Sequence, residues 1–469
     1  MTIDIGLSAV KAAVFRPDGS LEALSEAGND AVNHHGCCSE MNLPRLWELV
    51  CEATAGVFTG DVEKGSIAGV GLSAAGNGLY LLTPDGCDLL GVTSMDRRAG
   101  AFAEAWRKSP IGDRILEITG NHVWAGQPLP LLAHLREKGA LPDDFHLLFC
   151  KDWLRHRLTG EYVTDLSDAS AAGMLDLRTG EWSHEIFKDT GVGKFRLPRL
   201  TGSCQATGHV TRAASKESGI PEGIPVFAGG IDLALAAWAD GSGAPDTIHI
   251  TAGTWSINQL PCDGLEPSDV NRFLQVVTAP NGRDHTLVES SPTSAINLDV
   301  LCTLRGSSER DFIAWDDCLC GTPLDEDDPF YLPYPAGAWD LPGQSAEFRQ
   351  IRVGMTHATF VAAVYDGIAL GHTRQIRKFQ ERGSIRKLLV CGGMTRSDAW
   401  CQRLSDYSGL PMEVAENPHS SSWGAALCVF KGLEFETASA PRTGREYQPK
   451  PSHACAARYR RFAELMKNN

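Results

Sequence analysis

The alternation of apolar and polar positions predicts a β-rich beginning. Thr2–Ile5 and Lys11–Phe15 read as two short strands joined by a tight turn, and Pro17-Asp18-Gly19 follows them as a hairpin turn. Apolar residues then recur at helical spacing, which predicts an amphipathic helix over Asn42–Phe58. The chain thus begins with strands and then alternates strand and helix.

Apolar strands and helical pieces continue through the first half. Ile67–Ser73 and Gly78–Leu82 are predicted strands. From about Lys151 to Asp240 helical pieces and loops dominate, interrupted by an apolar strand at Pro225–Ala228. The short, polar, glycine-rich run at residues 240–245 suits a hinge or a domain boundary.

Strand signals restart after this run. A strand at Thr247–Thr251, a long helix at His357–Gln380 and a strand at Lys387–Cys391 are predicted, the last ending in a Gly-Gly turn. Asp4–Ser8 and Thr251–Ser256 are both strand-to-turn segments with a glycine and hydroxyl residues, and each opens one half of the chain. This predicts a duplicated fold with a cleft between its halves.

Length and charge narrow the class of protein. A chain of 469 residues is too long for one ordinary core, so we expect two domains, residues 1–241 and 242–469. The net charge of −15 argues against nucleic acid or an anionic membrane as partner, because both require clustered Lys and Arg. No apolar run approaches the ~18 residues of a membrane helix. Neither a leader pattern nor a C-x-x-C pair is visible, so we expect a cytoplasmic protein with reduced thiols.

Several residues could together transfer a phosphoryl group. That chemistry needs phosphates held in place, a metal to spread charge, and a carboxylate to take the acceptor's proton. Asp4 ends the first strand, where it could hold Mg²⁺ or merely cap a turn. Gly253-Thr254 and Gly392-Gly393 are further turns at strand ends that could meet phosphate.

Each of the other candidate polar residues allows a functional and a structural interpretation. Asp232 precedes an apolar run, as an N-cap or as a catalytic base at a cleft would. Asp96 with Arg98 suits sugar hydroxyls or a surface ion pair. Trp124 with Gln127 could face a sugar or lie in the core. The spacing of the His-His-Gly-Cys-Cys run at residues 34–38 suits tetrahedral zinc poorly.

With these motifs in order, the whole chain resembles the FGGY carbohydrate kinases. The resemblance implies an α/β fold of two ribonuclease-H-like (actin-like ATPase) domains, with ATP and Mg²⁺ in the cleft and closure of the domains on sugar binding. The N-terminal domain would then bind the sugar and supply the catalytic base, and the C-terminal domain would bind the nucleotide. The matching segments are Asp4–Lys11, Gly71–Ser73, Asp96–Arg98, Lys151–Leu154, Thr164–Ser170, Gly229–Asp232, Gly253-Thr254 and Cys391–Gly393.

The resemblance also implies roles for individual residues. Asp232 matches the catalytic base and Asp4 the metal-linked aspartate. Asp96, Arg98 and Trp124 are the expected sugar-side residues, together with Asp232. The expected nucleotide-binding residues are Gly6, Ser8, Lys11, Gly253, Thr254, Gly392, Gly393 and Asn417.

Within the family, several stretches are similar to L-xylulose kinases, so the expected acceptor is a ketopentose such as L-xylulose. Leu7, Ala75 and Gln127 depart from the residues usual at these positions, and only three residues precede Asp4 in the first strand. Erythritol or 3-keto-L-gulonate as acceptor, and a pseudokinase or nucleotide sensor, stay open. A homodimer is also left open.

Overall fold

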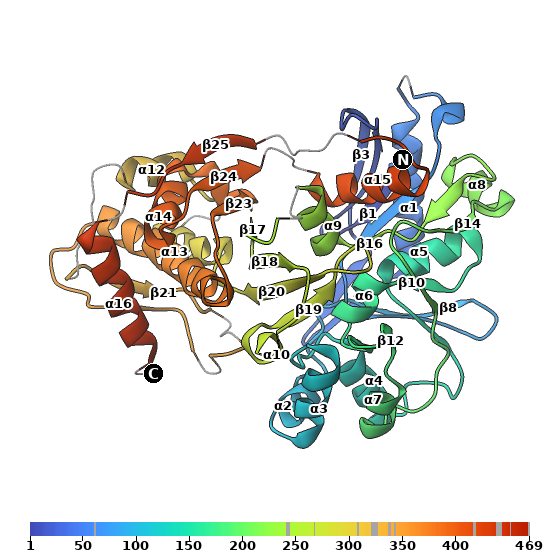
Figure 1. Ribbon diagram of the computed structural model, residues 1–469, viewed down its shortest axis with the longest axis horizontal. Helices are drawn as coiled ribbons and strands as arrows, with labels where there is room; N and C mark the ends of the chain where they lie inside the picture. Colours follow the sequence, from blue (N-terminus) through green and yellow to red (C-terminus); the bar gives the residue numbers. More distant parts are fainter. Residues whose placement is uncertain are drawn as a thin grey trace.

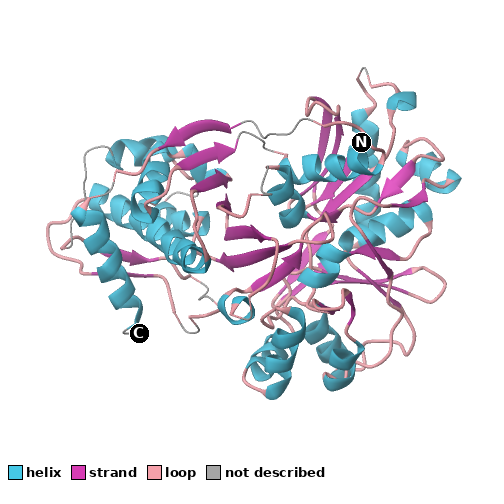
Figure 2. Ribbon diagram, in the orientation of Figure 1, coloured by secondary structure: helices cyan, strands magenta, loops and turns pink. Residues whose placement is uncertain are grey.

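The computed structural model describes the whole chain except residues 61, 241–243, 267, 307–308, 320–326, 336–338, 342–343, 416–418, 438–442, 451 and 468–469. The protein consists of two halves that lie side by side, the first on the right of Figure 1 and the second on the left. Strands form a sheet inside each half, and helices cover the sheets (Figure 2). No helix in the described ranges is long and apolar enough to cross a membrane.

The central sheet of the first half has five strands in the order β16-β6-β1-β2-β3. β1 pairs antiparallel with β2 and parallel with β6, which in turn pairs parallel with β16. The five strands are β1 (Thr2–Ile5), β2 (Ala9–Phe15), β3 (Leu21–Gly28), β6 (Gly71–Ala74) and β16 (Gly230–Ile231).

The central sheet of the second half has seven strands in the order β19-β20-β18-β17-β23-β24-β25. β17 pairs antiparallel with β18 and parallel with β23, and β23 pairs parallel with β24. The strands are β17 (Thr247–Ala252), β18 (Ser256–Cys262), β19 (Gln275–Thr278), β20 (His285–Ser291), β23 (Lys387–Cys391), β24 (Met412–Ala415) and β25 (Thr443–Tyr447).

The two sheets repeat one topology. The series β3-β2-β1-β6-β16 and β20-β18-β17-β23-β24 have the same order and the same strand directions. Each repeat therefore places one hairpin turn, after β1 or after β17, at the end of a central strand. The duplication predicted from Asp4–Ser8 and Thr251–Ser256 is present in the fold.

A second sheet of the first half, in the order β4-β5-β8-β7-β9, supports the loops that follow it. Its strands are β4 (Val32–His35), β5 (Cys38–Met41), β7 (Leu79–Leu82), β8 (Asp88–Val92) and β9 (His146–Leu148). Two-stranded pairs complete the strands: β10 (Val163–Asp165) with β13 (Arg199–Thr201), β11 (Leu175–Asp176) with β12 (Glu181–Trp182), β14 (Ala206–His209) with β15 (Pro225–Phe227), and β21 (Phe330–Leu332) with β22 (Glu347–Arg349).

Helices pack on both halves. The first half contains α1 (Leu43–Val57), η1 (Lys64–Ser66), α2 (Gly100–Arg107), α3 (Pro110–Thr119), α4 (Pro128–Glu137), α5 (Cys150–Thr159), α6 (Leu166–Ala171), α7 (His184–Asp189), α8 (Arg212–Ser218) and α9 (Asp232–Ala239). The second contains α10 (Asp269–Arg272), η2 (Ala295–Leu298), α11 (Asp299–Arg305), α12 (Phe312–Leu319), α13 (His357–Arg382), η3 (Gly393–Arg396), α14 (Asp398–Ser408), α15 (Ser420–Gly432) and α16 (His453–Lys467).

Helix α15 links the two halves. It follows β24 in the chain, yet it packs against α9, β1 and β6 of the first half, as its red ribbon among blue and green elements shows (Figure 1). Trp423 of α15 lies 5.4 Å, centroid to centroid, from the ring of Phe15 at the end of β2. Leu235 of α9 packs against Ala425 and Cys428 of the same helix. The second half of the sequence thus supplies part of the packing on the first sheet.

Candidate active site

A cavity of about 820 Å³ opens between the two halves. Its walls come from α9 of the first half and from the ends of β17, β23 and β24, and the first residues of α15 complete it. Asp232, Gly392, Gly393, Ser420 and Ser421 are among the residues that line it. The cavity therefore lies where the cleft between repeated domains was predicted.

The two predicted phosphate turns are tight hairpin turns. The backbone N–H of Gly6 donates to the carbonyl of Ala9 (2.9 Å), and the Nδ2 of Asn29 donates to the carbonyl of Gly6 (2.8 Å). At the matching place in the second half, the N–H of Gly253 donates to the carbonyl of Trp255 (3.1 Å). Both turns are fixed by hydrogen bonds before any ligand arrives.

The turn after β23 packs directly against the turn after β17. Gly392 has φ +101°, and a Cβ at this position would lie 2.7 Å from the carbonyl of Ala252. Only glycine fits such close backbone in this conformation. Gly393 is exposed, and a Cβ there would meet nothing within 4 Å. The predicted Gly-Gly turn is thus close-packed at its first residue and open at its second.

Of the predicted nucleotide residues that the structure describes, Gly392 and Gly393 line the cavity, whereas Gly6, Ser8, Lys11, Gly253 and Thr254 do not. Ser8 and Thr254 are exposed on their turns. Lys11 lies on β2, directly across from Asp4 in the register of the sheet. Asn417 falls outside the residues that the structure describes.

Asp232 begins α9 at the wall of the cavity. The N-cap position belongs to Ile231, so Asp232 is not the cap of this helix, although its Oδ1 accepts the N–H of Leu233 (2.6 Å). Loss of solvation raises the pKa of Asp232 to about 7, and the negative charges of Asp4 and Asp168 add to the effect. A carboxyl with a pKa near the working pH is suited to general base catalysis.

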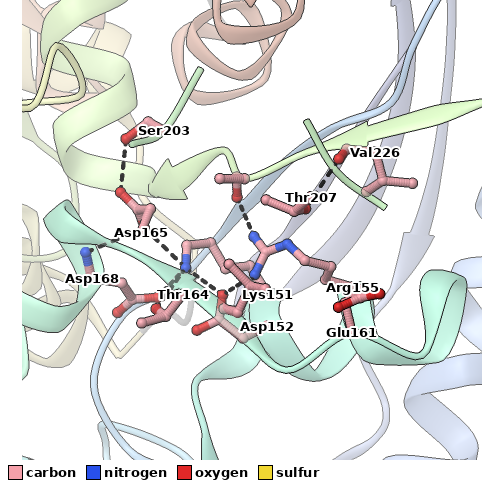
Figure 3. Close-up of polar contacts among 12 residues, drawn as sticks. Lys151, Asp152, Arg155, Glu161, Thr164, Asp165, Asp168, Ser203, Thr207 and Val226 are labelled. Atoms are coloured by element: carbon pink, nitrogen blue, oxygen red, sulfur yellow. Dashed lines mark hydrogen bonds and ion pairs between the residues drawn. The ribbon is translucent and has the colours of Figure 1, made fainter. Parts of the chain in front are cut away.

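Figure 3 shows a buried charge cluster around Lys151, which includes Asp168, one of the charges that act on Asp232. The ammonium of Lys151 contacts Asp152 (2.6 Å), Asp165 (3.0 Å) and Asp168 (3.2 Å), and all four side chains are inaccessible to solvent. Burial disfavours the charge of Lys151, but the three carboxylates together raise its pKa above the usual value. Arg155 also bonds to Asp152, so three acids face two cations, and burial raises the pKa of Asp168.

This cluster fixes the strand that precedes Asp232. Ser167 Oγ donates to Asp165 (2.6 Å) and accepts the N–H of Ile231 (3.1 Å). Arg155 donates to the carbonyl of Ala228, just before β16. Both ends of the short β16 segment are therefore held by buried charged or hydroxyl groups, and the position of Asp232 follows from them.

Three loops of the first half meet beside β16, the strand that precedes Asp232. A Cβ on Gly76 would lie 2.0 Å from Ile231 Cδ1, so the loop after β6 lies directly on β16. The N–H of Gly78 donates to the carbonyl of Gly126 (2.9 Å), which joins this loop to the Trp124–Gln127 turn. Gly126 in turn packs on the backbone of Ser94, two residues before Asp96.

Unpaired polar atoms are buried in these loops. The Oε1 of Gln127 accepts the N–H of Trp124 (3.1 Å). Gln127 Nε2, Trp124 Nε1 and Asn77 Oδ1, however, have no hydrogen-bond partner within the described part of the chain. Buried polar groups are normally paired, so these atoms suit a ligand that carries several hydroxyls.

Asp96 and Arg98 form a buried ion pair, not a surface one. Asp96 is inaccessible to solvent, and its oxygens accept bonds from Ser39 N (2.7 Å), Arg98 N (2.9 Å) and Arg98 Nε (2.9 Å). Arg98 also donates to Glu40 (2.6 Å). With both oxygens bonded to protein, Asp96 orients Arg98 and the Ser94 loop, and Arg98 is the more accessible of the two.

The surroundings of Asp4 fit a carboxylate that would hold Mg²⁺. Its Oδ2 accepts a bond from Ser421 (2.8 Å), and its Oδ1 accepts none from the described residues. No group of three or more His, Cys, Asp or Glu side chains in the described ranges could hold a metal ion. Mg²⁺ commonly binds one or two carboxylates and completes its shell with water and substrate phosphates, so a single carboxylate beside the cavity suffices.

Comparison with known proteins agrees with this geometry. Residues 1–239 match the N-terminal domain, and residues 249–432 the C-terminal domain, of the FGGY family of carbohydrate kinases. The chain belongs to this family. It is an FGGY carbohydrate kinase that uses ATP to phosphorylate a sugar.

Curated relatives of this FGGY kinase align over most of its length. The L-xylulose/3-keto-L-gulonate kinase of Escherichia coli is 26% identical over 439 residues, which cover 92% of this chain and 87% of the relative. The xylulose kinase of Bacillus subtilis is 26% identical over 506 residues, with 99% and 95% covered.

Solved structures share the fold of the FGGY kinase at lower identity. The xylulose kinase of Rhodospirillum rubrum has a TM-score of 0.88 at 21% identity, with 99% of this chain and 98% of that chain covered. The gluconate kinase of Lactobacillus acidophilus has a TM-score of 0.90 at 18% identity, with 99% and 96% covered. The predicted fold of two ribonuclease-H-like domains is confirmed.

Sequence analysis overlooked Asn77, which lies in the loop that packs on β16. Asn77 is 7% exposed and has φ +62°, a conformation uncommon for residues with a side chain. Its position between Gly76 and Gly78 in the sequence is the one signal that could have found it.

Proposed function

We propose that this FGGY kinase transfers the γ-phosphoryl group of ATP to a hydroxyl of a neutral ketopentose such as L-xylulose, with Asp232 as general base. The observation that carries the proposal is the position of Asp232 at the wall of the cleft cavity, directly after Ile231, on which the loop that carries Asn77 packs. Its raised pKa suits a residue that must take a proton near neutral pH.

The roles of the surrounding residues follow from the chemistry. Asp232 accepts the proton of the sugar hydroxyl as that oxygen attacks the γ-phosphorus. The N–H groups of the Gly6 and Gly253 turns hold the phosphates, and the Gly392-Gly393 turn holds the rest of the nucleotide. Asp4 would hold Mg²⁺, which spreads the negative charge of the phosphates when it is bound.

The loops that carry Asn77, Trp124 and Arg98 form the proposed sugar side of the site, and their hydrogen bonds orient the acceptor. Trp124 offers a ring face and an indole N–H, Gln127 an amide N–H, and Asn77 a carbonyl oxygen. Arg98, which Asp96 orients, donates from the edge of the same loops. Closure of the cleft on the sugar excludes water, so ATP hydrolysis without sugar is slow. A cytoplasmic location and the homodimer stay predictions from the sequence.

The charges near Asp232 favour a neutral acceptor over a sugar acid. Asp4 and Asp168 already raise the pKa of Asp232, so a further carboxylate in the pocket would meet like charge. The buried cations Lys151 and Arg98 are engaged by protein carboxylates. One observation supports a sugar acid such as 3-keto-L-gulonate: Arg97 is exposed and makes no ion pair with the described residues.

The test is ADP release with Mg·ATP across ketopentoses, tetritols and keto-sugar acids, run beside Asp232→Asn. We expect turnover on a ketopentose that falls roughly 10²- to 10⁴-fold in the variant. Faster turnover on a sugar acid, abolished by Arg97→Gln, would instead establish the second acceptor class. ATP binding without turnover on any member of the panel would support a pseudokinase.

A further inference from the structure

Helix α15 delivers three consecutive serines to the edge of the cleft. Its packing against Phe15 and Leu235 fixes the helix on the first half of the protein. Ser420 and Ser421, its first two residues, line the cavity together with Asp232 and Gly392. Their hydroxyls are thus held at a defined place relative to β1, although they come from the other half of the sequence.

The three hydroxyls have different partners. Ser421 Oγ donates to Asp4 Oδ2 at 2.8 Å, and Ser420 Oγ donates to Asp240 Oδ1 at 2.7 Å. Ser422 Oγ is buried and has no hydrogen-bond partner within the described part of the chain. One turn of helix therefore contains a hydroxyl that donates to the expected metal carboxylate and a neighbouring hydroxyl without a hydrogen-bond partner among the described residues.

We propose that Ser421 is a positioning residue for Asp4: its hydrogen bond to Oδ2 fixes the carboxylate that would hold the Mg²⁺ of Mg·ATP. The proposal rests on the role of Asp4 in the proposed function. Asp4 is 8% exposed, and Oδ1 accepts no hydrogen bond from the described residues, so the bond from Ser421 is the side-chain contact that fixes its carboxylate. A hydrogen bond to a charged acceptor is among the stronger ones in proteins, and pre-orientation of a metal ligand raises metal affinity.

A purely structural role for Ser421 predicts a different effect when its hydroxyl is removed. His419 is the N-cap of α15 and makes no side-chain cap bond. In a purely structural role, the hydroxyl of Ser421 would only stabilise this end of the helix. Its removal would then lower thermal stability without changing metal affinity. Metal affinity and thermal stability, measured on the same variants, separate the two roles.

The experiment measures Mn²⁺ binding by electron paramagnetic resonance in the presence of ADP, a readout that requires no turnover. We expect Ser421→Ala to raise the Kd for Mn²⁺ roughly tenfold, the factor that corresponds to about 1.4 kcal/mol. Ser422→Ala, the matched control one residue away, should leave the Kd unchanged, and Ser421→Thr should restore most of the affinity. ADP binding in EDTA, followed by calorimetry, should be equal in all variants.

The outcomes separate this proposal from the one on which it rests. An unchanged Kd in Ser421→Ala, or an equal loss in Ser422→Ala, overturns the positioning role, while a large loss in Asp4→Asn keeps Asp4 as the metal residue. An unchanged Kd in Asp4→Asn overturns both. A tenfold rise in Ser421→Ala alone, with unaltered melting temperature, supports the positioning role.

Discussion

Asp232 must be ionised to accept a proton, and its surroundings oppose ionisation. Its pKa is raised to about 7, first by loss of solvation and then by the charges of Asp4 and Asp168. Because the active form is the carboxylate, kcat/KM should fall as the pH decreases through about 7 and level off above it. A pH profile of kcat/KM on the best acceptor checks this, and an acidic limb near pH 4 would contradict it.

The charge of Asp168 provides a second test of what sets the pKa of Asp232. Asp168→Asn removes a like charge that acts on Asp232 and keeps the shape of the side chain. The acidic limb should move to lower pH, by less than about one unit, because Asp168 contributes less to the shift than burial and Asp4 do. Asp143→Asn, an exposed charge change, serves as control. A limb that moves to higher pH would show that Asp168 does not act through its charge.

The sequence singled out Asp4 and Asp232, each of which lies two residues from a glycine. Asp232 lines the cleft cavity, and Asp4 accepts a hydrogen bond from Ser421, which also lines it; their roles in catalysis and metal binding stay predictions. Ser421 was not predictable, because its significance depends on a contact between segments far apart in the chain, whereas the glycines on either side of Asn77 were a signal for that residue. Ser421 lies 417 residues from the aspartate that it contacts.

At the scale of elements, the turns after β17 and β23 depend on each other. Gly392→Ala introduces a Cβ 2.7 Å from Ala252 in a residue with φ +101°, which should cost about 1–3 kcal/mol of folding stability. Gly393→Ala is the matched control, because its Cβ would meet nothing within 4 Å. Urea unfolding of both variants checks the difference, and equal stability would show that the close packing of the two turns is unimportant.

The buried cluster joins α5, α6 and β10 to the strand before Asp232. Lys151→Met removes the cation that three buried carboxylates share, so the free energy of unfolding should fall by about 3–5 kcal/mol. Lys138→Met, an exposed lysine at the end of α4, should change stability little. Urea unfolding provides the comparison, and a loss below about 1 kcal/mol in Lys151→Met would contradict the structural role of the cluster.

Elements with a clear period were predicted well. The helix expected at Asn42–Phe58 is α1, which those two residues cap at either end, and the strand expected at Lys387–Cys391 is β23. The long helix expected at His357–Gln380 is α13, two residues longer. Short strands such as β10 and β16 escaped prediction, because two or three residues show no period and their pairing depends on distant partners.

At the scale of the molecule, the sequence boundary and the packing boundary differ. The first repeat ends with α9 at Ala239 and the second begins with β17 at Thr247, yet α15 of the second half packs on the first sheet. Sequence periodicity does not show which sheet α15 covers. Connections usually join neighbouring elements, and a helix that returns to the other domain is visible only in three dimensions.

Because α15 of the second half packs on the first sheet, we expect a fragment without this helix to be unstable. Residues 1–241 alone lack α15, so Phe15 and Leu235, now buried, would be exposed to water. Each large apolar side chain contributes about 1.5–3 kcal/mol when buried, and domains are only marginally stable. We expect this fragment to aggregate or to lack a cooperative thermal transition by circular dichroism. The same fragment joined through a flexible linker to residues 419–436 should regain the transition, because α15 is restored. A cooperative transition in the fragment without α15 would show that the first half is stable without that helix.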